Sequence, residues 1–480
     1  MSDYLVYYER VSPTTWVYLS SLLMISLFFK FNRLWSFRNL DLIGLILLAP
    51  GLLFVIYGQE KASPAYEQTG YIWLFTIGGL FLIRMLLDPL MVRRPLLEPN
   101  LSVGGLTFLG LSLLIFLMAN VAADKPAERS SLRRLSADLT DASTVESPIV
   151  LKADIDRDKP ENQPVEEPLV LYGPGYPWVF EIFQLPTRFL FQSERPAAKS
   201  TSPFVSGLRT PVELATARTV AIFSYLAIVI GLVVIGYRHF DNIKTGIAAA
   251  VLYLLLPYTA ILTGRYMDTA DGIGQVYHVL LAALLVWAVA TYRRPLISGI
   301  LLGLAIGMFY YPIFLLPLWC SFYWQRGVVR FTAGVISMLV LLVSILYFHH
   351  YGPSFSADVR QMFGWVFPRM ENLKGFWGLS INDPVYRIPV LAAFVAMCLT
   401  LMIWPAQKNL GTLLSCSAAV MLGIQFWHAL GGGQLLGWYL PLTLLTIFRP
   451  NLEDRVALTV LNQWSFAKRK SALSAVDRAA

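Results

Sequence analysis

The sequence predicts an all-α integral membrane protein with about thirteen transmembrane helices. The chain is 56% hydrophobic and 14% charged, with a mean hydropathy of +0.57, whereas a soluble globular domain carries about 25% charged residues. Apolar runs of roughly 18 residues or more, long enough to cross a bilayer, recur along the chain. The formal charge of +8 fits the basic loops of a membrane protein, so we expect no nucleic-acid partner.

The chain divides into four parts by composition. Residues 1–101 form an N-terminal segment of three membrane helices, and residues 102–350 form a membrane core that includes a long polar segment at 122–214. Residues 351–448 contain a further polar segment and the C-terminal helices, and residues 449–480 form a basic tail. The apolar runs lie near 14–30, 40–57, 71–88, 102–121, 215–237, 243–263, 273–291, 296–324, 328–348, 388–405, 411–428 and 432–448.

The run at 296–324 is too long for one span of about 20 residues. Pro312 lies near its middle and Pro317 follows. Proline removes a backbone donor and clashes with the preceding helical turn. We therefore expect two short helices joined near Pro312 as a hairpin.

The basic residues predict an orientation in the cytoplasmic (inner) membrane. With the N-terminus and the segments 122–214 and 349–387 outside and the C-terminus inside, every inner loop is basic. These loops and the tail contain Lys30, Arg33, Arg38, Arg93, Arg94, Arg238, Lys244, Arg293, Arg294, Arg326, Arg330, Lys408, Lys468, Arg469 and Lys470. The N-terminus lacks a basic region followed at once by an apolar stretch, so we expect no cleavable signal peptide.

The stretch "YGPGYPWVFEIF", which begins at Tyr172, ends the long outer segment. Gly173 and Gly175 permit a sharp turn, and the prolines stiffen it. The following "WVFEIFQLPTRFLF" has an apolar face, with Glu181 and Arg188 available to the interface. We expect a helix lying in the plane of the membrane surface, either as an anchor or as one wall of a substrate groove.

Asp268 and Asp271 lie in a predicted outer turn, "TGRYMDTADGIGQVYHVL". They suit helix capping, or a carboxylate pair that binds a cation or a sugar. His278 lies about two turns into the next helix, where it serves either a helix–helix hydrogen bond or a ligand. Asp124, directly after the fourth apolar run, is a surface charge or a general base.

The outer segment at 349–387 contains His349, His350 and Arg360 among several aromatic residues. Cations beside aromatic rings suit a sugar with an anionic phosphate, and equally an amphipathic segment at the lipid headgroups. The three cysteines show no CxxC spacing. The sequence contains no metal motif and names no cofactor, although a divalent cation remains a candidate.

The order of these features resembles the GT-C superfamily of multi-span glycosyltransferases, closest to bacterial mannosyltransferase-like members that use a polyprenyl-phosphate sugar. The likeness covers roughly residues 102–325, through "YGPGYPWVFEIFQLP", "TARTVAIFSYLAIVIGLVVIGYR", "AAAVLYLLLPYTAILTGRYMDTADG" and "YRRPLISGILLGLAIGMFYYPIFLLPLW". It implies a GT-C-like core and an inverting transfer at the outer membrane face.

The resemblance also assigns residues. It places the turn at Tyr172, Gly173 and Pro174, the arginine of the following helix at Arg218, and the hairpin at Gly299, Gly303, Leu304, Pro312 and Pro317. It implies a catalytic carboxylate at Asp124, Asp268 or Asp271, while Asp154, Asp156 and Asp158 compete with Asp124. The cation that members carry before the hairpin proline is replaced here by Phe309, Tyr310 and Tyr311. A multi-pass transporter and a non-catalytic scaffold for envelope assembly are the alternative functions.

Overall fold

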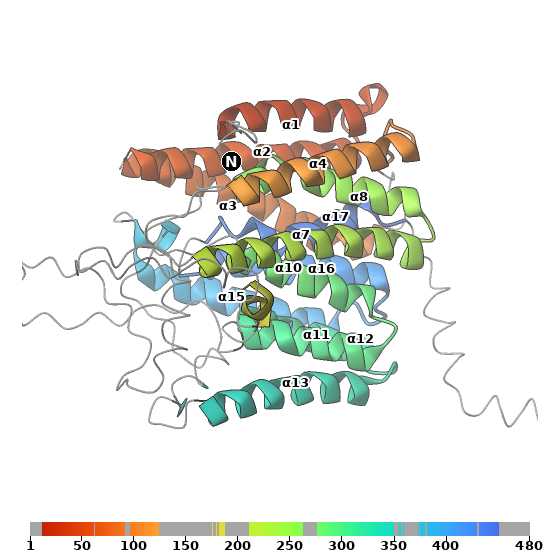
Figure 1. The fold of residues 1–480 in the computed structure, drawn as a ribbon, viewed down its shortest axis with the longest axis vertical. Coiled ribbons are helices and arrows are strands. Elements are labelled where there is room, and N and C mark those ends of the chain that lie inside the picture. The colour runs from red at the N-terminus through yellow and green to blue at the C-terminus, as the bar shows by residue number, and fades with distance from the viewer. Residues whose placement is uncertain are drawn as a thin grey trace, which may run out of the picture.

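The protein is a bundle of helices that run roughly side by side (Figure 1). The computed structural model describes residues 12–61, 63–91, 97–123, 175, 179, 182–187, 211–262, 276–349, 355–356, 359, 373, 375–379, 382–429 and 432–450. Over these ranges the regular structure is helical, without strands. This confirms an all-α protein of membrane character.

The longer helices match the apolar runs. They are α1 (Pro13–Phe28), α2 (Phe37–Glu60), α3 (Pro64–Leu87), α4 (Val103–Ala123), α7 (Pro211–His239), α8 (Ile243–Leu255), α10 (Val276–Ala290), α11 (Pro295–Met308), α13 (Val328–His349), α15 (Arg387–Ile403) and α16 (Leu410–Trp427). Shorter pieces are η1 (Phe31–Arg33), η2 (Asp88–Leu90), α9 (Pro257–Leu262), η4 (Tyr311–Leu315), α12 (Leu316–Tyr323), η5 (Gly375–Gly378), η6 (Pro384–Tyr386), η7 (Leu436–Trp438) and α17 (Leu440–Phe448).

Within the described ranges, seven helices are long and apolar enough to cross a membrane, and five further apolar helices are shorter. These numbers do not reach the expected count of about thirteen transmembrane helices. Breaks interrupt the runs at 243–263 and 432–448, since a run of apolar residues need not form one continuous helix.

The hairpin expected at 296–324 is confirmed. α11 ends at Met308, η4 contains Pro312, and α12 returns toward the start of α11. The hydroxyl of Tyr323 donates to the carbonyl of Tyr292 at 2.7 Å, which brings the two open ends of the hairpin together.

The break between α8 and α9 lies at Leu256 and Pro257. Pro257 has no N–H to donate to the carbonyl of Tyr253, four residues earlier. The hydroxyl of Thr259 donates to that carbonyl instead, at 2.7 Å. A broken helix inside an apolar protein is tolerated when side chains satisfy the freed backbone groups in this way.

The segment from His428 to Tyr439 is the second break. The sequence predicts a helix from about residue 432, but α17 begins only at Leu440, and residues 432–439 are buried. The side-chain carbonyl of Gln425 accepts the N–H groups of Gly433 and Leu435, both at 3.2 Å. Gly433 has a φ of +91°, a conformation that favours glycine.

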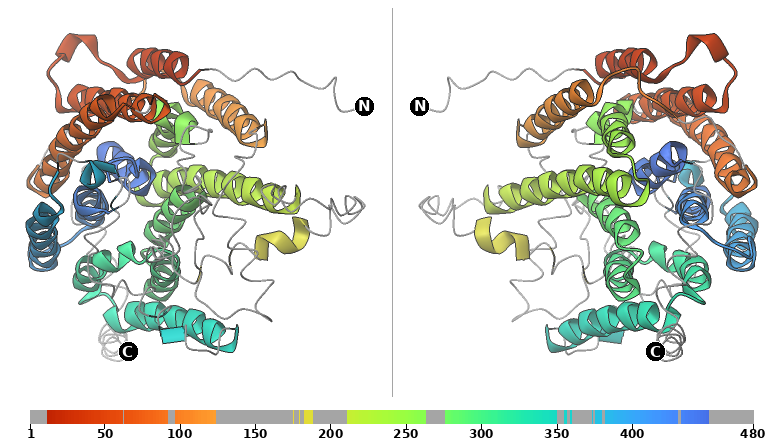
Figure 2. Two further views of the ribbon diagram at one scale, coloured as in Figure 1. Left: turned by 90° about the vertical axis from the view of Figure 1, so that its left-hand side faces the viewer. Right: turned by 90° about the vertical axis from the view of Figure 1, so that its right-hand side faces the viewer.

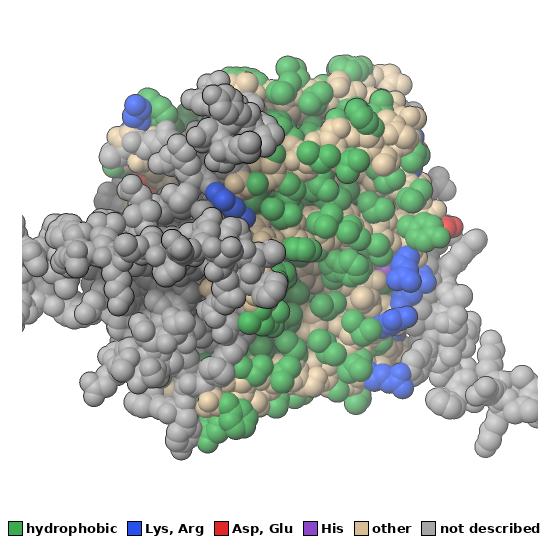
Figure 3. Space-filling model, in the orientation of Figure 1, with side chains coloured by type: hydrophobic (Ala, Val, Ile, Leu, Met, Phe, Trp, Pro, Cys, Tyr) green, Lys and Arg blue, Asp and Glu red, His purple; other side chains and the backbone are tan. Residues whose placement is uncertain are grey.

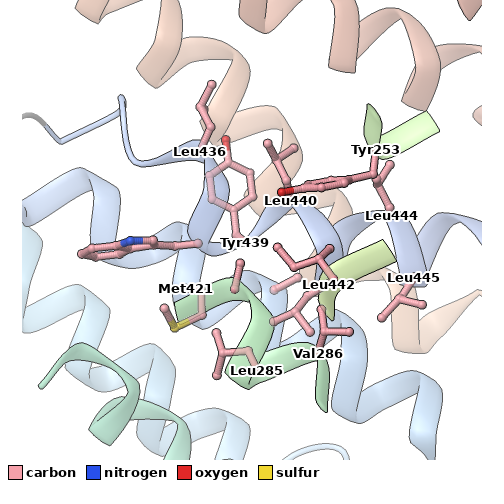
Figure 4. Packing of buried hydrophobic residues seen from close by; sticks show 14 of the residues in the cluster. Tyr253, Leu285, Val286, Met421, Leu436, Tyr439, Leu440, Leu442, Leu444 and Leu445 are labelled. Atoms are coloured by element: carbon pink, nitrogen blue, oxygen red, sulfur yellow. The ribbon is translucent and has the colours of Figure 1, made fainter. Parts of the chain in front are cut away.

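The core lies around α16 and α17. α16 is buried along almost its whole length, as expected of a helix that is apolar on every side. Figure 4 shows Tyr253, Leu285, Met421 and Tyr439 packed around α17. In Figure 2, α1–α4 (red to orange) cover one side of this core, and α11–α13 (teal) cover the opposite side.

Lys and Arg side chains gather at one end of the bundle, at the right-hand edge of Figure 3, while apolar side chains cover the adjoining face. At this end, which we call the basic end, α7 ends, α8 and α11 begin, α12 ends and α13 begins. The described basic residues in these connections are Arg238, Lys244, Arg293, Arg294, Arg326 and Arg330.

Four charged residues join the beginning and the end of the chain near the basic end. Arg84 donates to both carboxylate oxygens of Asp41, at 3.0 and 3.1 Å, and to Asp88 at 2.9 Å. Arg449, directly after α17, donates to the second oxygen of Asp88 at 2.7 Å. Asp88 is fully buried, and the two acids balance the two guanidinium groups.

Candidate functional site

Most of the predicted site residues lie outside the part of the chain that the structure describes. These are Asp124, Tyr172, Asp268, Asp271, His350 and Arg360. His278 belongs to α10 and His349 to α13, with side chains outside the described set. Arg218 is half-buried in the first half of α7.

Gly175 lies against the hairpin. A Cβ atom on Gly175 would lie 2.9 Å from the carbonyl oxygen of Gly307, near the end of α11, and 3.3 Å from Leu342 of α13. Such a separation is too short for a side chain, so only glycine permits this approach. The contact places Gly175 beside the break between α11 and η4.

The same face of α11 brings α13 close. A Cβ atom on Gly303 would lie 2.9 Å from the carbonyl oxygen of Val335, and Gly299 approaches the carbonyl of Phe331. Glycines at this spacing let two helices pack at very short range. Gly299 and Gly303 therefore permit the close approach of α13, and Gly307, one further turn along α11, contacts Gly175.

The helical residues 182–187 lie against α7. The hydroxyls of Thr187 and Thr216 form a hydrogen bond of 2.6 Å, and the ring centroids of Phe183 and Phe223 lie 6.0 Å apart. Gln184 and Thr187 are buried, whereas Ile182 and Leu185 are exposed. Gln184 and Thr187 thus face the protein while Ile182 and Leu185 face outward, which suits a helix bordered by lipid.

Aromatic residues from the hairpin and from the buried segment after α16 form one cluster. We define the aromatic cluster as Phe309, Tyr310, Tyr311, Trp427, His428 and Trp438. The ring of Tyr311 lies 4.0 Å from that of Tyr310, 4.8 Å from that of His428 and 5.1 Å from that of Trp438, measured between centroids. The cluster lies at the end of the bundle opposite the basic end, where α11 and α16 terminate.

Arg387 adds a buried positive charge to this cluster. It is the first residue of α15, and its Nε and Nη2 atoms donate to the carbonyl oxygen of Trp427 at 3.2 and 3.1 Å. The ring of Trp427 lies 5.8 Å from that of Tyr311, measured between centroids. The guanidinium group is therefore held at a residue of the aromatic cluster.

Sequence reasoning missed Arg387 and the aromatic cluster. Arg387 directly precedes the apolar run at 388–405, where a basic residue is common as a surface charge. The only signal was the replacement of the hairpin cation by Phe309, Tyr310 and Tyr311. Nothing in the sequence placed residues 309–311 beside residue 387 or residue 428.

The described residues include no group of three or more His, Cys, Asp or Glu side chains that could hold a metal ion. Cys320, Cys398 and Cys416 are free thiols. A scan against known protein families and a search of curated proteins both find no match to the chain. At the end of the bundle opposite the basic end, the described residues bring together one buried cation, a cluster of aromatic rings and Gly175 beside a helix break.

Proposed function

We propose that the protein is a membrane glycosyltransferase that moves a sugar from a polyprenyl-phosphate donor to an acceptor at the end of the bundle opposite the basic end. The observation that carries this proposal is the contact of Gly175 with Gly307 beside the aromatic cluster. Gly175, the end of α11 and the buried Arg387 all lie at this end of the bundle. The type of reaction, transfer of a sugar from a lipid phosphate, is taken from the resemblance to GT-C glycosyltransferases.

In this proposal Arg387 binds the donor phosphate. A guanidinium group presents several N–H donors in one plane, and this geometry matches the oxygens of a phosphate. The carbonyl of Trp427 fixes the orientation of the group. The surrounding rings exclude water, and a drier environment strengthens the attraction between the cation and the phosphate.

The reaction follows the inverting course expected of such enzymes. One carboxylate, with Asp124, Asp268 and Asp271 as candidates, takes the proton of an acceptor hydroxyl. The oxygen attacks the anomeric carbon, the bond from that carbon to the phosphate oxygen breaks, and the lipid phosphate leaves with the negative charge. Tyr172, Arg218, His278, His349, His350 and Arg360 are the further candidates for binding the substrate, and a divalent cation is a candidate for stabilising the phosphate.

The test uses the full chain in nanodiscs supplied with radiolabelled polyprenyl-phosphate sugars. Asp124, Asp268 and Asp271 are each replaced by Asn, and we expect loss of transfer with retained donor binding for the one that acts as the base. Asp383→Asn is the matched control, because Asp383 is an exposed carboxylate at the same end that caps η6 through the N–H of Val385.

The phosphate role is measured separately, by equilibrium binding of the donor. Arg387→Leu should weaken donor binding at least tenfold, and Arg387→Lys should restore part of it. A chelator added to the wild type tests the divalent cation. The proposal fails if the wild type binds no polyprenyl-phosphate sugar and transfers none.

A transporter is the second candidate, and the helix breaks favour it. Interrupted helices, here at Pro257 and at residues 428–439, frame the substrate sites of many transporters. Sealed proteoliposomes distinguish the two functions. A transporter moves labelled substrate across the membrane without altering it, whereas a transferase leaves the sugar covalently attached to an acceptor.

A further inference from the structure

The loop that joins α1 to α2 presents large apolar side chains outward at the basic end. Trp35 is 87% exposed, more than any other large hydrophobic side chain that the structure describes, and Phe31, Leu34 and Phe37 are also exposed. An isolated exposed apolar residue needs no explanation. Here four of them lie within seven residues, three in the connection and Phe37 at the start of α2.

This exposure is fixed by the fold. Asn39 is fully buried and forms three hydrogen bonds with the backbone of the loop. Its Oδ1 accepts the N–H of Lys30 at 3.2 Å, and its Nδ2 donates to the carbonyls of Lys30 at 2.9 Å and Leu34 at 3.3 Å. Ser36 caps the start of α2 by accepting the N–H of Asn39. The loop is thus held in a shape that keeps its apolar side chains outside.

A second asparagine holds the other side of the loop. Nδ2 of Asn100 donates to the carbonyl of Ser26 at 3.0 Å, and its Oδ1 accepts from the ammonium group of Lys30. Asn100 belongs to the connection before α4, so two separate parts of the chain brace the same loop. The loop is therefore held in one shape from two sides.

The charge of the loop is positive throughout. Lys30, Arg33 and Arg38 lie within it, and residues 29–40 contain no acid. The first acid, Asp41, is buried and paired with Arg84. The turn from α12 to α13 repeats the pattern at the same end, since Trp324 is exposed beside Arg326 and Arg330 in the sequence.

We propose that residues 30–38 form an anchor loop that binds anionic phospholipids. Indole rings favour the boundary between headgroups and acyl chains, where one edge of the ring is wet and the other apolar. Lysine and arginine at that depth attract anionic headgroups, with about 1 kcal/mol for each charge near the surface. The anchor loop has both an exposed indole ring and basic side chains, and its backbone is held by hydrogen bonds. The proposal therefore places the basic end in a leaflet that contains anionic lipids.

The depth of the anchor loop is measured with a spin label at Leu34→Cys, in a full-length chain whose three native cysteines are replaced by Ala. The protein is reconstituted in nanodiscs of phosphatidylcholine with or without phosphatidylglycerol. We expect the label to report the headgroup layer, through comparable collision with oxygen and with a water-soluble nickel chelate. Trp35→Ala in the same chain should shift the label toward water.

Lipid preference is measured by the association of spin-labelled phosphatidylglycerol and phosphatidylcholine with the protein. Arg33→Gln should lower the preference for phosphatidylglycerol about fivefold, the equivalent of about 1 kcal/mol. Phe348→Ala is the matched control, because Phe348 is 82% exposed but lies at the opposite end of the bundle. It should change neither measurement.

Two results would overturn the proposal. A label at residue 34 that is freely accessible to the nickel chelate, with equal association of the two lipids, would show that the loop lies in water. A label that is immobilised only in native membranes and moves freely in every nanodisc would show that the loop binds another protein.

Discussion

Arg449 donates a 2.7 Å hydrogen bond to Asp88, although 361 positions separate the two residues in the chain. Both side chains are buried, and Asp88 also accepts from Arg84. The pair therefore connects the end of α17 to the end of α3, which packs against α2. Because both charged groups are buried away from water, the carboxylate of Asp88 and the guanidinium group of Arg449 each stabilise the charge of the other.

Removing one member of this pair should lower the free energy of unfolding. Asp88→Leu leaves the guanidinium group of Arg449 buried without its counter-charge, and we expect a loss of about 3–5 kcal/mol in unfolding free energy. Asp88→Leu combined with Arg449→Leu should lose less than the sum of the two single changes. The measurement is denaturant unfolding in detergent micelles. Additive losses would show that the two side chains do not interact.

The glycine face of α11 provides a second prediction. Gly303→Ala places a methyl group 2.9 Å from the carbonyl oxygen of Val335, where backbone must move. We expect a loss of about 1–3 kcal/mol from overpacking. Gly79→Ala in α3 is the control, since no atom lies within 4 Å of the added methyl group. That change should raise stability by about 0.5–1 kcal/mol, because alanine restricts the unfolded chain.

The break at Pro257 depends on a single hydroxyl. Thr259→Val keeps the size of the side chain but removes the donor to the carbonyl of Tyr253. A buried carbonyl without a partner costs about 1–3 kcal/mol. Thr76→Val is the matched control, because the hydroxyl of Thr76 bonds to the carbonyl of Ile72 on an exposed face of α3. Equal thermal stability of Thr259→Val and the wild type would contradict the prediction.

The buried ammonium group of Lys408 should make the stability of the protein depend on pH. Its ammonium group donates to Ser321 Oγ at 2.9 Å and to the carbonyls of Met402 at 3.0 Å and Pro405 at 2.9 Å. Burial lowers the pKa of Lys408 from its ordinary value of 10.5. Between the lowered pKa and 10.5 the unfolded chain binds a proton that the folded chain has released, so the free energy of unfolding rises with pH.

Lys408→Met removes this titration and serves as the reference. Melting temperatures of the wild type and the variant are compared from neutral pH up to the ordinary lysine pKa. The wild type should gain stability relative to Lys408→Met across that range. A constant difference between the two proteins would show that Lys408 keeps its ordinary pKa.

The apolar runs predicted the helical class and most helix positions, because the length of an apolar segment is a local property. Pro312 and Pro317 predicted the hairpin because the effect of a proline on its helix is also local. The breaks within the runs could not be predicted, since the hydrogen bonds of Gln425 and Thr259 that stabilise them form only in the folded chain. Arg387 was missed because its contact with the carbonyl of Trp427, 40 positions away, also forms only in the folded chain.

The link from Asp88 to Arg449 also bears on how the protein is made. A ribosome releases the chain in order, so α3 enters the membrane 361 residues before the partner of Asp88 is synthesised. During that interval Asp88 has Arg84, on its own helix, as its counter-charge. Asp88 therefore gains its second counter-charge only after α17 has been synthesised, so this contact between the α2–α3 pair and α17 belongs to a late step of assembly.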